Sequence, residues 1–175
     1  MHPERWHYRE PKSGLTVSIA PPVLRLFESS RQRLWQRERG GVLFAESIGT
    51  SGWLEIVDAT IPHADDRSGW NWLKLNHQRC LDEISDRYTR GLHFVGYWHT
   101  HPERTPKPSA RDITVLQRNL HEGGVPLQKL IAVIVGTDRA ATGLCVATIS
   151  KANPAPSIFV PLSMQTGDVL EPAQD

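Results

Sequence analysis

Three features are scarce in this sequence: cysteine, net charge and long apolar runs. Only two cysteines, Cys80 and Cys145, occur in 175 residues, so a disulfide-stapled secreted fold is not indicated and a reducing, cytoplasmic compartment is expected. The 20 lysines and arginines nearly balance the 19 aspartates and glutamates, which gives a formal net charge of +1. A protein that coats nucleic acid carries a strong basic excess, and we therefore expect no nucleic-acid partner.

The longest run of consecutive apolar residues, 130–135, is far shorter than the roughly 18 residues that a membrane span requires. The N-terminal residues also lack the apolar segment of a secretory signal, so we expect neither membrane insertion nor export. The chain does have 39% hydrophobic and 22% charged residues, which is enough for a buried core. Its length fits one domain of about 150 residues. We place this domain at residues 15–165, with a loose N-terminal extension over 1–14 and a flexible C-terminal tail over 166–175.

The pattern of apolar residues predicts strands alternating with helices. Strands are expected over 15–20, 42–48, 53–61, 92–98, 130–136, 143–149 and 158–162, with a further short strand near 70–75. Helical spacing predicts helices from Pro21 to Gly40, over 77–89 and over 109–121. Residues 49–52 are typical of a hairpin turn and residues 62–69 of a loop. This order predicts an α/β fold, in which helices pack on a layered or curled sheet.

The segment Gly96-Tyr97-Trp98-His99-Thr100-His101-Pro102 is the part of the sequence that most indicates chemistry. In a strand, side chains two residues apart point to the same side, and their Cα atoms lie about 6–7 Å apart. The imidazoles of His99 and His101 can therefore converge on one metal ion with Zn–N distances of about 2.0–2.1 Å. The alternative is that the pair is only a polar strand edge.

Asp112, in the first turn of the helix after a proline-rich loop, offers a third ligand. Two histidines, one carboxylate and an open fourth position are typical of a catalytic zinc site. Ser109 and Asp112 also fit a helix capping box, which needs no metal, and the two roles are compatible. A zinc hydrolase further needs a base beside the ion. Glu38 is a candidate, expected at the end of a helix, although in the run Arg37-Glu38-Arg39 it also fits a solvated surface residue.

Three segments together resemble the JAMM motif of the JAB/MPN family of zinc isopeptidases: Glu38-Arg39-Gly40-Gly41-Val42-Leu43-Phe44, His99-Thr100-His101-Pro102 and Ser109-x-x-Asp112. The resemblance implies the MPN fold, a curled mixed β-sheet flanked by helices. It also implies one Zn²⁺ per chain, bound by His99, His101 and Asp112. Glu38 then corresponds to the catalytic base that activates water, and the hydroxyl of Ser109 helps to hold the oxyanion.

The residues around His99 and Ser109 are further similar to the stand-alone JAMM peptidases of bacterial type II CBASS anti-phage operons. This similarity implies cleavage after the C-terminus of a conjugated protein, which reverses the ubiquitin-like conjugation of a cyclic-oligonucleotide synthase. Two alternatives stay open: processing of a ubiquitin-like or sulfur-carrier precursor, and a non-catalytic MPN scaffold. For the peptidase, we expect the extended C-terminal tail of the substrate protein to bind between residues 65–72, beside Trp70 and Trp72, and residues 103–108. The oligomeric state is not predicted.

Overall fold

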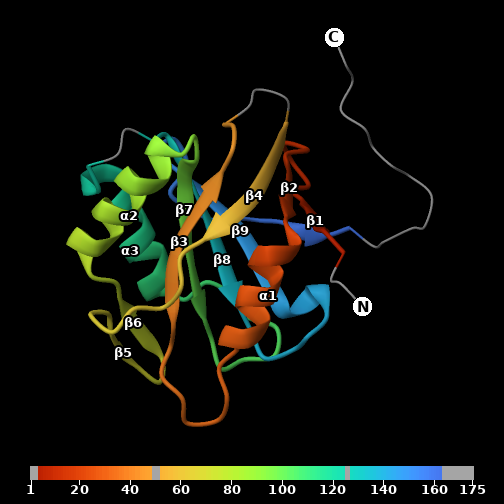
Figure 1. Cartoon of the computed structure of the whole chain (residues 1–175). Helices are drawn as coiled ribbons and strands as arrows, with labels where there is room; N and C mark the ends of the chain where they lie inside the picture. Colours follow the sequence, from red (N-terminus) through yellow and green to blue (C-terminus); the bar gives the residue numbers. More distant parts are fainter. Residues whose placement is uncertain (1–3, 49–51, 125–126, 163–175) are drawn as a thin grey trace.

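Within the residues that the structure describes, a mixed sheet of nine strands forms the centre of the fold, in the order β10-β9-β8-β7-β3-β4-β2-β1-β11 (Figure 1). The computed structural model describes residues 4–48, 52–124 and 127–162. The strands of this sheet are β1 (Trp6–Arg9), β2 (Thr16–Ile19), β3 (Gly40–Ala45), β4 (Trp53–Ala59), β7 (His93–Thr100), β8 (Lys129–Val135), β9 (Leu144–Ser150), β10 (Ser157–Ile158) and β11 (Val160–Pro161). The helices are α1 (Pro21–Ser30), α2 (His77–Thr89) and α3 (Ala110–Glu122), with a short 3-10 turn, η1 (Ala141–Gly143). The predicted α/β fold with a helix-flanked mixed sheet is confirmed.

Helices cover both faces of the sheet. On one face, α1 packs through Val23, Leu24 and Phe27 against a cluster that includes Leu43 of β3. On the other face, α2 and α3 pack against a second cluster, to which β3 contributes Val42 and Phe44. A strand that is buried on both faces reads as a continuous apolar run, which is why the central strands are visible in the sequence.

Both cysteines, Cys80 on α2 and Cys145 on β9, are buried free thiols, as the cysteine count predicts. None of the helices that the structure describes combines the length and the apolar character needed to cross a bilayer.

The first helix ends earlier than its sequence predicts. It begins at Pro21, where the missing N–H of proline is tolerated, but it ends at Ser30 and not near Gly40. Beyond it, Leu34 and Trp35 are 80% and 83% exposed, so their helical spacing marks no buried face. Trp35 also has a φ of 66°, which a right-handed helix does not contain. The expectation that Glu38 ends a helix is therefore wrong, and Glu38 lies in an irregular segment before β3.

The N-terminal residues that we expected to be loose contain a strand. β1 pairs antiparallel with β2 and with β11. Tyr8 in β1 is fully buried, and its hydroxyl donates a hydrogen bond to the carbonyl oxygen of Ala141 at 2.9 Å. The expectation of a loose extension is thus wrong for Trp6–Arg9, because the pairing partner β11 lies at the other end of the described chain. The expected C-terminal tail, 166–175, lies outside the described residues.

A separate hairpin, formed by β5 (Arg67–Gly69) and β6 (Trp72–Lys74), lies beside the start of β3. The backbone N–H of Glu38 donates to the carbonyl oxygen of Gly69 at 2.8 Å, which fastens the hairpin to the segment before β3. The predicted loop over 62–69 is therefore wrong at its last residues, while the short strand expected near 70–75 is present as β6. Of the predicted turn at 49–52, residues 49–51 lie outside the described residues.

Candidate metal centre

Three potential metal ligands meet where β7 ends and α3 begins. His99 lies in β7 and His101 follows it directly, so their side chains project to the same side, and their Nε2 atoms are 3.0 Å apart. Asp112, in the first turn of α3, places Oδ1 3.2 Å from Nε2 of His99 and Oδ2 3.3 Å from Nε2 of His101. The structure thus brings together the three residues that the sequence predicts as ligands.

The spacing of these atoms fits a divalent metal ion. An ion at about 2.0–2.1 Å from tetrahedral ligands separates neighbouring ligand atoms by about 3.3 Å. The two Nε2 atoms here are 3.0 Å apart, and each lies 3.2 or 3.3 Å from a different oxygen of Asp112. With one ligand atom taken from each residue, all three lie within 4.8 Å of one another, which is close enough for one ion to contact all three side chains. Two imidazoles and one carboxylate are a ligand set that zinc accepts, and catalytic zinc sites use three protein ligands and keep the fourth position for water or substrate.

The start of α3 fixes the carboxylate of Asp112. Its backbone N–H donates to Oγ of Ser109 at 3.2 Å, and the backbone N–H of Ser109 donates to Oδ2 of Asp112 at 2.7 Å. These two bonds form a capping box. Although burial favours the neutral acid, hydrogen bonds from His101 and His99 hold the pKa of Asp112 well below its usual range. The capping box and a metal-binding role are therefore compatible, since the box orients an ionised carboxylate toward the imidazoles.

Glu38 reaches this cluster from the segment before β3. The residue is 4% exposed, and its Oε1 lies 3.9 Å from Nε2 of His101. Burial raises the pKa of Glu38 to about 7. The segment is held by the hydrogen bond to Gly69 and by a second one, from the backbone N–H of Thr100 to the carbonyl oxygen of Arg39 at 2.8 Å. Glu38 is thus not a solvated surface residue, and it lies next to the ligands without joining their closest contacts.

Two further residues at the site are not singled out by the sequence analysis. Oε2 of Glu103 lies 3.1 Å from Nδ1 of His101. Burial lowers the pKa of His101, but the carboxylates of Asp112, Glu38 and Glu103 outweigh that effect and raise it. A histidine ligand often directs its other nitrogen to a carboxylate, so the position of Glu103 two residues after His101 was an available signal. The hydroxyl of Thr100 accepts a hydrogen bond from the N–H of Arg39 at 3.0 Å. No pattern in the sequence indicates this contact.

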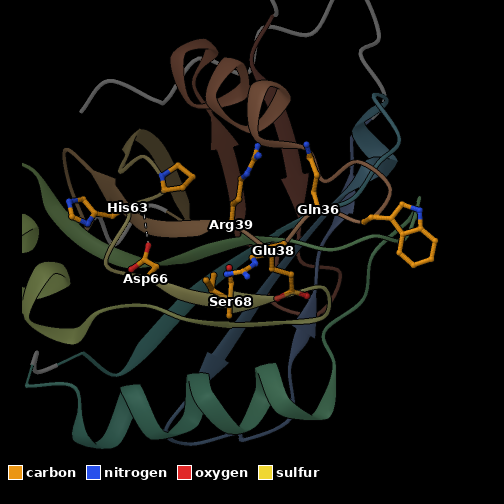
Figure 2. A pocket seen from close by; sticks show the side chains of 10 residues that line it. Gln36, Glu38, Arg39, His63, Asp66 and Ser68 are labelled. Atoms are coloured by element: carbon orange, nitrogen blue, oxygen red, sulfur yellow. Dashed lines mark hydrogen bonds between the residues drawn. The ribbon is translucent and has the colours of Figure 1, made fainter.

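A cavity of about 520 Å³ lies beside Glu38 (Figure 2). Its lining comes from the segment before β3, the loop after β4 and the β5–β6 hairpin, through Trp35, Gln36, Arg37, Glu38, Arg39, Pro62, His63, Asp66, Ser68 and Leu73. The hairpin lines this cavity with Ser68 and Leu73, whereas Trp70 and Trp72, the tryptophans expected beside the substrate tail, do not line it. Residues 103–108, the other expected wall, do not line this cavity.

Comparison with known proteins gives relatives for this site. A family model described as prokaryotic homologs of the JAB domain matches residues 21–148, a range that contains all five motif residues. Three curated proteins are each named CD-NTase/cGAS isopeptidase. The one from Enterobacter hormaechei is 26% identical over 141 residues, which are 81% of this chain and 78% of that protein. Those from Escherichia coli and Vibrio cholerae are 30% identical, over 69% and 74% of this chain and 75% and 81% of their own lengths.

The fold has a counterpart among solved structures. A protein from Desulfitobacterium hafniense aligns with a TM-score of 0.56 at 15% identity, covering 82% of this chain and 88% of that one. At this identity the similarity shows the fold alone. The family match and the names of the curated relatives confirm the predicted resemblance to JAB/MPN isopeptidases. The matched range covers most of the chain and all of the ligand cluster, and this protein belongs to the family of prokaryotic homologues of the JAB domain.

Proposed function

We propose that this protein is a zinc-dependent isopeptidase that releases a conjugated CD-NTase from its target in a CBASS-type anti-phage system. The observation that carries the proposal is the cluster of His99, His101 and Asp112, whose ligand atoms lie within 4.8 Å of one another. The name shared by three relatives supports CD-NTase as the substrate protein. In this proposal each chain binds one Zn²⁺ and acts in the cytoplasm on a protein with an extended C-terminal tail.

The residues of the site divide the chemistry among them. His99, His101 and Asp112 would hold the ion, which when bound supplies Lewis acidity toward the scissile carbonyl and the attacking water. Glu38 takes a proton from the water as its oxygen attacks the carbonyl carbon, and returns the proton to the amine as the C–N bond breaks. Oγ of Ser109 accepts from the N–H of Asp112, which leaves the hydroxyl proton of Ser109 for the developing oxyanion.

The burial of Glu38 favours an enzyme over a non-catalytic scaffold. A carboxylate that is 4% exposed loses hydration, which destabilises the folded protein. A non-catalytic scaffold gains nothing from a buried carboxylate at this position. A base that must take up and release a proton beside the ligands does require such a place. The names of the relatives favour an isopeptidase over a peptidase that processes precursors.

Metal analysis tests the ligand set. We expect close to one zinc per chain in the purified protein, and loss of that zinc in the His99→Ala/His101→Ala double variant. Replacement of His121, a histidine in the last turn of α3, by alanine serves as the control and should leave the zinc in place. Full retention of zinc by the double variant would show that the ligands are elsewhere.

Substitution of Glu38 tests the activity. Glu38→Gln keeps the size of the side chain and its burial but cannot accept a proton, so hydrolysis should fall at least about 100-fold while zinc content stays unchanged. The substrate is a fluorescent protein fused after the C-terminal tail of a candidate CD-NTase, and cleavage is followed on gels. Glu122→Gln, an exposed glutamate at the far end of α3, is the matched control. Near wild-type cleavage by Glu38→Gln would exclude Glu38 as the base.

A further inference from the structure

We infer that the cavity beside Glu38 selects substrate tails that carry acidic residues, through Arg37 and Arg39. The inference rests on the proposed isopeptidase function and specifies its substrate, as a C-terminal tail with at least one aspartate or glutamate upstream of the scissile bond. It is supported by the position of the cavity, by the charges that line it and by the directions in which its side chains extend.

The cavity begins where the proposed chemistry takes place. Glu38 forms part of its lining and also approaches Nε2 of His101 to 3.9 Å, so a scissile carbonyl between these residues has the cavity next to it. One wall is β5, which within the described chain pairs with β6 and is joined to the opposite wall by the bond between Glu38 and Gly69. Extended backbone of this kind can bind a peptide by strand addition, with side-chain contacts supplying selectivity.

Apart from Glu38, the charged side chains that line the cavity without an ion-pair partner in the described residues are positive. Arg37 is exposed and Arg39 is half-buried, and neither forms a salt bridge within the described residues. Asp66, in contrast, is already neutralised, because both of its carboxylate oxygens accept from Arg79 at 2.8 Å. Apart from Glu38, which faces the ligand cluster, the cavity therefore offers no unpaired carboxylate to compete with a substrate for the two guanidinium groups.

The two arginines suit a carboxylate on the tail. A guanidinium group binds a carboxylate through parallel N–H···O bonds and stays charged at any physiological pH. Figure 2 shows Glu38 and Arg39 extending to opposite sides of their segment, so Arg39 can bind the tail away from the reacting carbonyl. Arg37 and Arg39 are thus specificity residues and not catalytic ones. They attract an acidic tail and repel a basic one, so both attraction and repulsion contribute to the choice of substrate.

A binding measurement tests the inference without hydrolysis. The Glu38→Gln variant is titrated against a fluorescent peptide with the C-terminal sequence of the same candidate CD-NTase, and against that peptide with each acid replaced by its amide. We expect the amide peptide to bind about tenfold or more weakly, since bonds to charged groups contribute that much. Added salt should lower the affinity for the acidic peptide more than the affinity for the amide peptide.

Charge reversal on the protein gives the complementary test. Arg37→Glu/Arg39→Glu should lose affinity for the acidic peptide to a similar extent and gain affinity for a peptide with lysines in the acidic positions. Arg33→Glu is the control, because Arg33 is exposed in the same segment but does not line the cavity. If the double variant does not fold, as judged by circular dichroism, Arg37→Gln and Arg39→Gln replace it, and each should lose part of the affinity.

Three results would overturn the inference: equal affinity for the acidic and amide peptides, no effect of the arginine substitutions, or a CD-NTase tail without any acidic residue. Failure of the proposed function gives a different result. The wild-type protein loaded with zinc would then leave the CD-NTase fusion uncut, whatever the charges of the tail. Equally fast cleavage of acidic and amide tails would support the isopeptidase function and contradict the proposed selection by charge.

Discussion

Trp35 holds an unfavourable backbone conformation while its side chain faces solvent. Its φ is 66°, a region that costs a non-glycine residue about 1–2 kcal/mol, and its ring is 83% exposed, so packing returns little of that cost. Strained residues cluster at functional sites, and Trp35 lines the cavity beside Glu38. We therefore connect Trp35 with substrate binding and not with folding.

Comparing two substitutions of Trp35, by glycine and by alanine, should separate the effect of its ring on substrate binding from the effect of its backbone strain on stability. Trp35→Gly removes both, so the free energy of unfolding should stay the same or rise by up to about 1 kcal/mol, while KM for tail-bearing substrates rises. Trp35→Ala removes the ring but keeps a Cβ at positive φ, so KM should rise equally without the gain in stability. Denaturant unfolding and steady-state kinetics measure the two effects. A destabilised Trp35→Gly with an unchanged KM would show that Trp35 serves the fold.

Ser109 combines a structural and a proposed chemical role, which two substitutions can distinguish. At a helix N-cap, replacement of serine by alanine costs about 1 kcal/mol, whereas glycine costs only a few tenths. Both replacements remove the hydroxyl that we assign to the oxyanion. We expect Ser109→Ala and Ser109→Gly to lower kcat to a similar extent, with zinc retained in both, and only the alanine variant to unfold clearly earlier in denaturant. A kcat that follows stability across the pair would reduce Ser109 to a helix cap.

The individual residues of the site differ in how far the sequence alone could place them. His99 and His101 follow from the two-residue period of a strand, and Ser109 with Asp112 from the pattern of a capping box. The burial of Glu38 does not follow from any local rule, because its segment is held by hydrogen bonds to distant residues, from Glu38 to Gly69 and from Thr100 to Arg39. Its proposed role could be predicted only from a family resemblance, and its place in an irregular segment was not predicted at all.

At the scale of elements, one side chain ties the Glu38 segment to the β5–β6 hairpin. Gln32 is 3% exposed, and its Nε2 donates to the carbonyl oxygens of Gln36 at 2.7 Å and Trp70 at 2.8 Å. Together with the bond from Glu38 to Gly69, this amide fixes the distance between the two walls of the cavity. If Glu38 is the base and the tail binds in this cavity, as we propose, Gln32 positions both.

Gln32→Leu keeps a side chain of similar size but leaves two carbonyl groups without their donor, at about 1–3 kcal/mol for each one that stays buried. We expect a higher KM for tail substrates and a lower kcat, while zinc content is unchanged. Gln117→Leu is the matched control, since the Nε2 of Gln117 donates to a carbonyl oxygen in an exposed loop. Thermal unfolding is measured beside the kinetics. Unchanged kcat and KM in a destabilised Gln32→Leu would confine Gln32 to a role in stability.

The boundaries of elements show the limit of local patterns. The central strands are apolar on both faces, and their existence is evident from sequence. The early end of α1 is not, because Leu34 and Trp35 fit a helical spacing although neither is buried. β1 pairs with its neighbours β2 and β11 and was not predicted from its own residues, whereas the strand predicted over 158–162 is divided between β10 and β11. Pairing with distant segments, which sequence patterns do not encode locally, makes β1 a strand.

At the scale of the whole molecule, we expect the hydrophobic core not to depend on the candidate metal site, which lies where β7 ends and α3 begins. The two hydrophobic clusters are formed by side chains of the sheet and the helices, and none of the three candidate ligands belongs to either cluster. The capping box holds Asp112 through protein atoms alone. This differs from small zinc-dependent domains, in which metal binding supplies the folding free energy itself.

Removal of the metal should therefore abolish hydrolysis without unfolding the protein. After treatment with a chelator, we expect far-ultraviolet circular dichroism to keep its native shape and thermal unfolding to stay cooperative. The midpoint should be lower, because zinc that binds only the folded state stabilises it by RT ln(1 + [Zn²⁺]/Kd), and it should rise again as zinc is added back. The His99→Ala/His101→Ala variant should unfold near the chelated wild type and not respond to zinc. Loss of the native spectrum on chelation would contradict this, since the metal would then be holding β7 and α3 together.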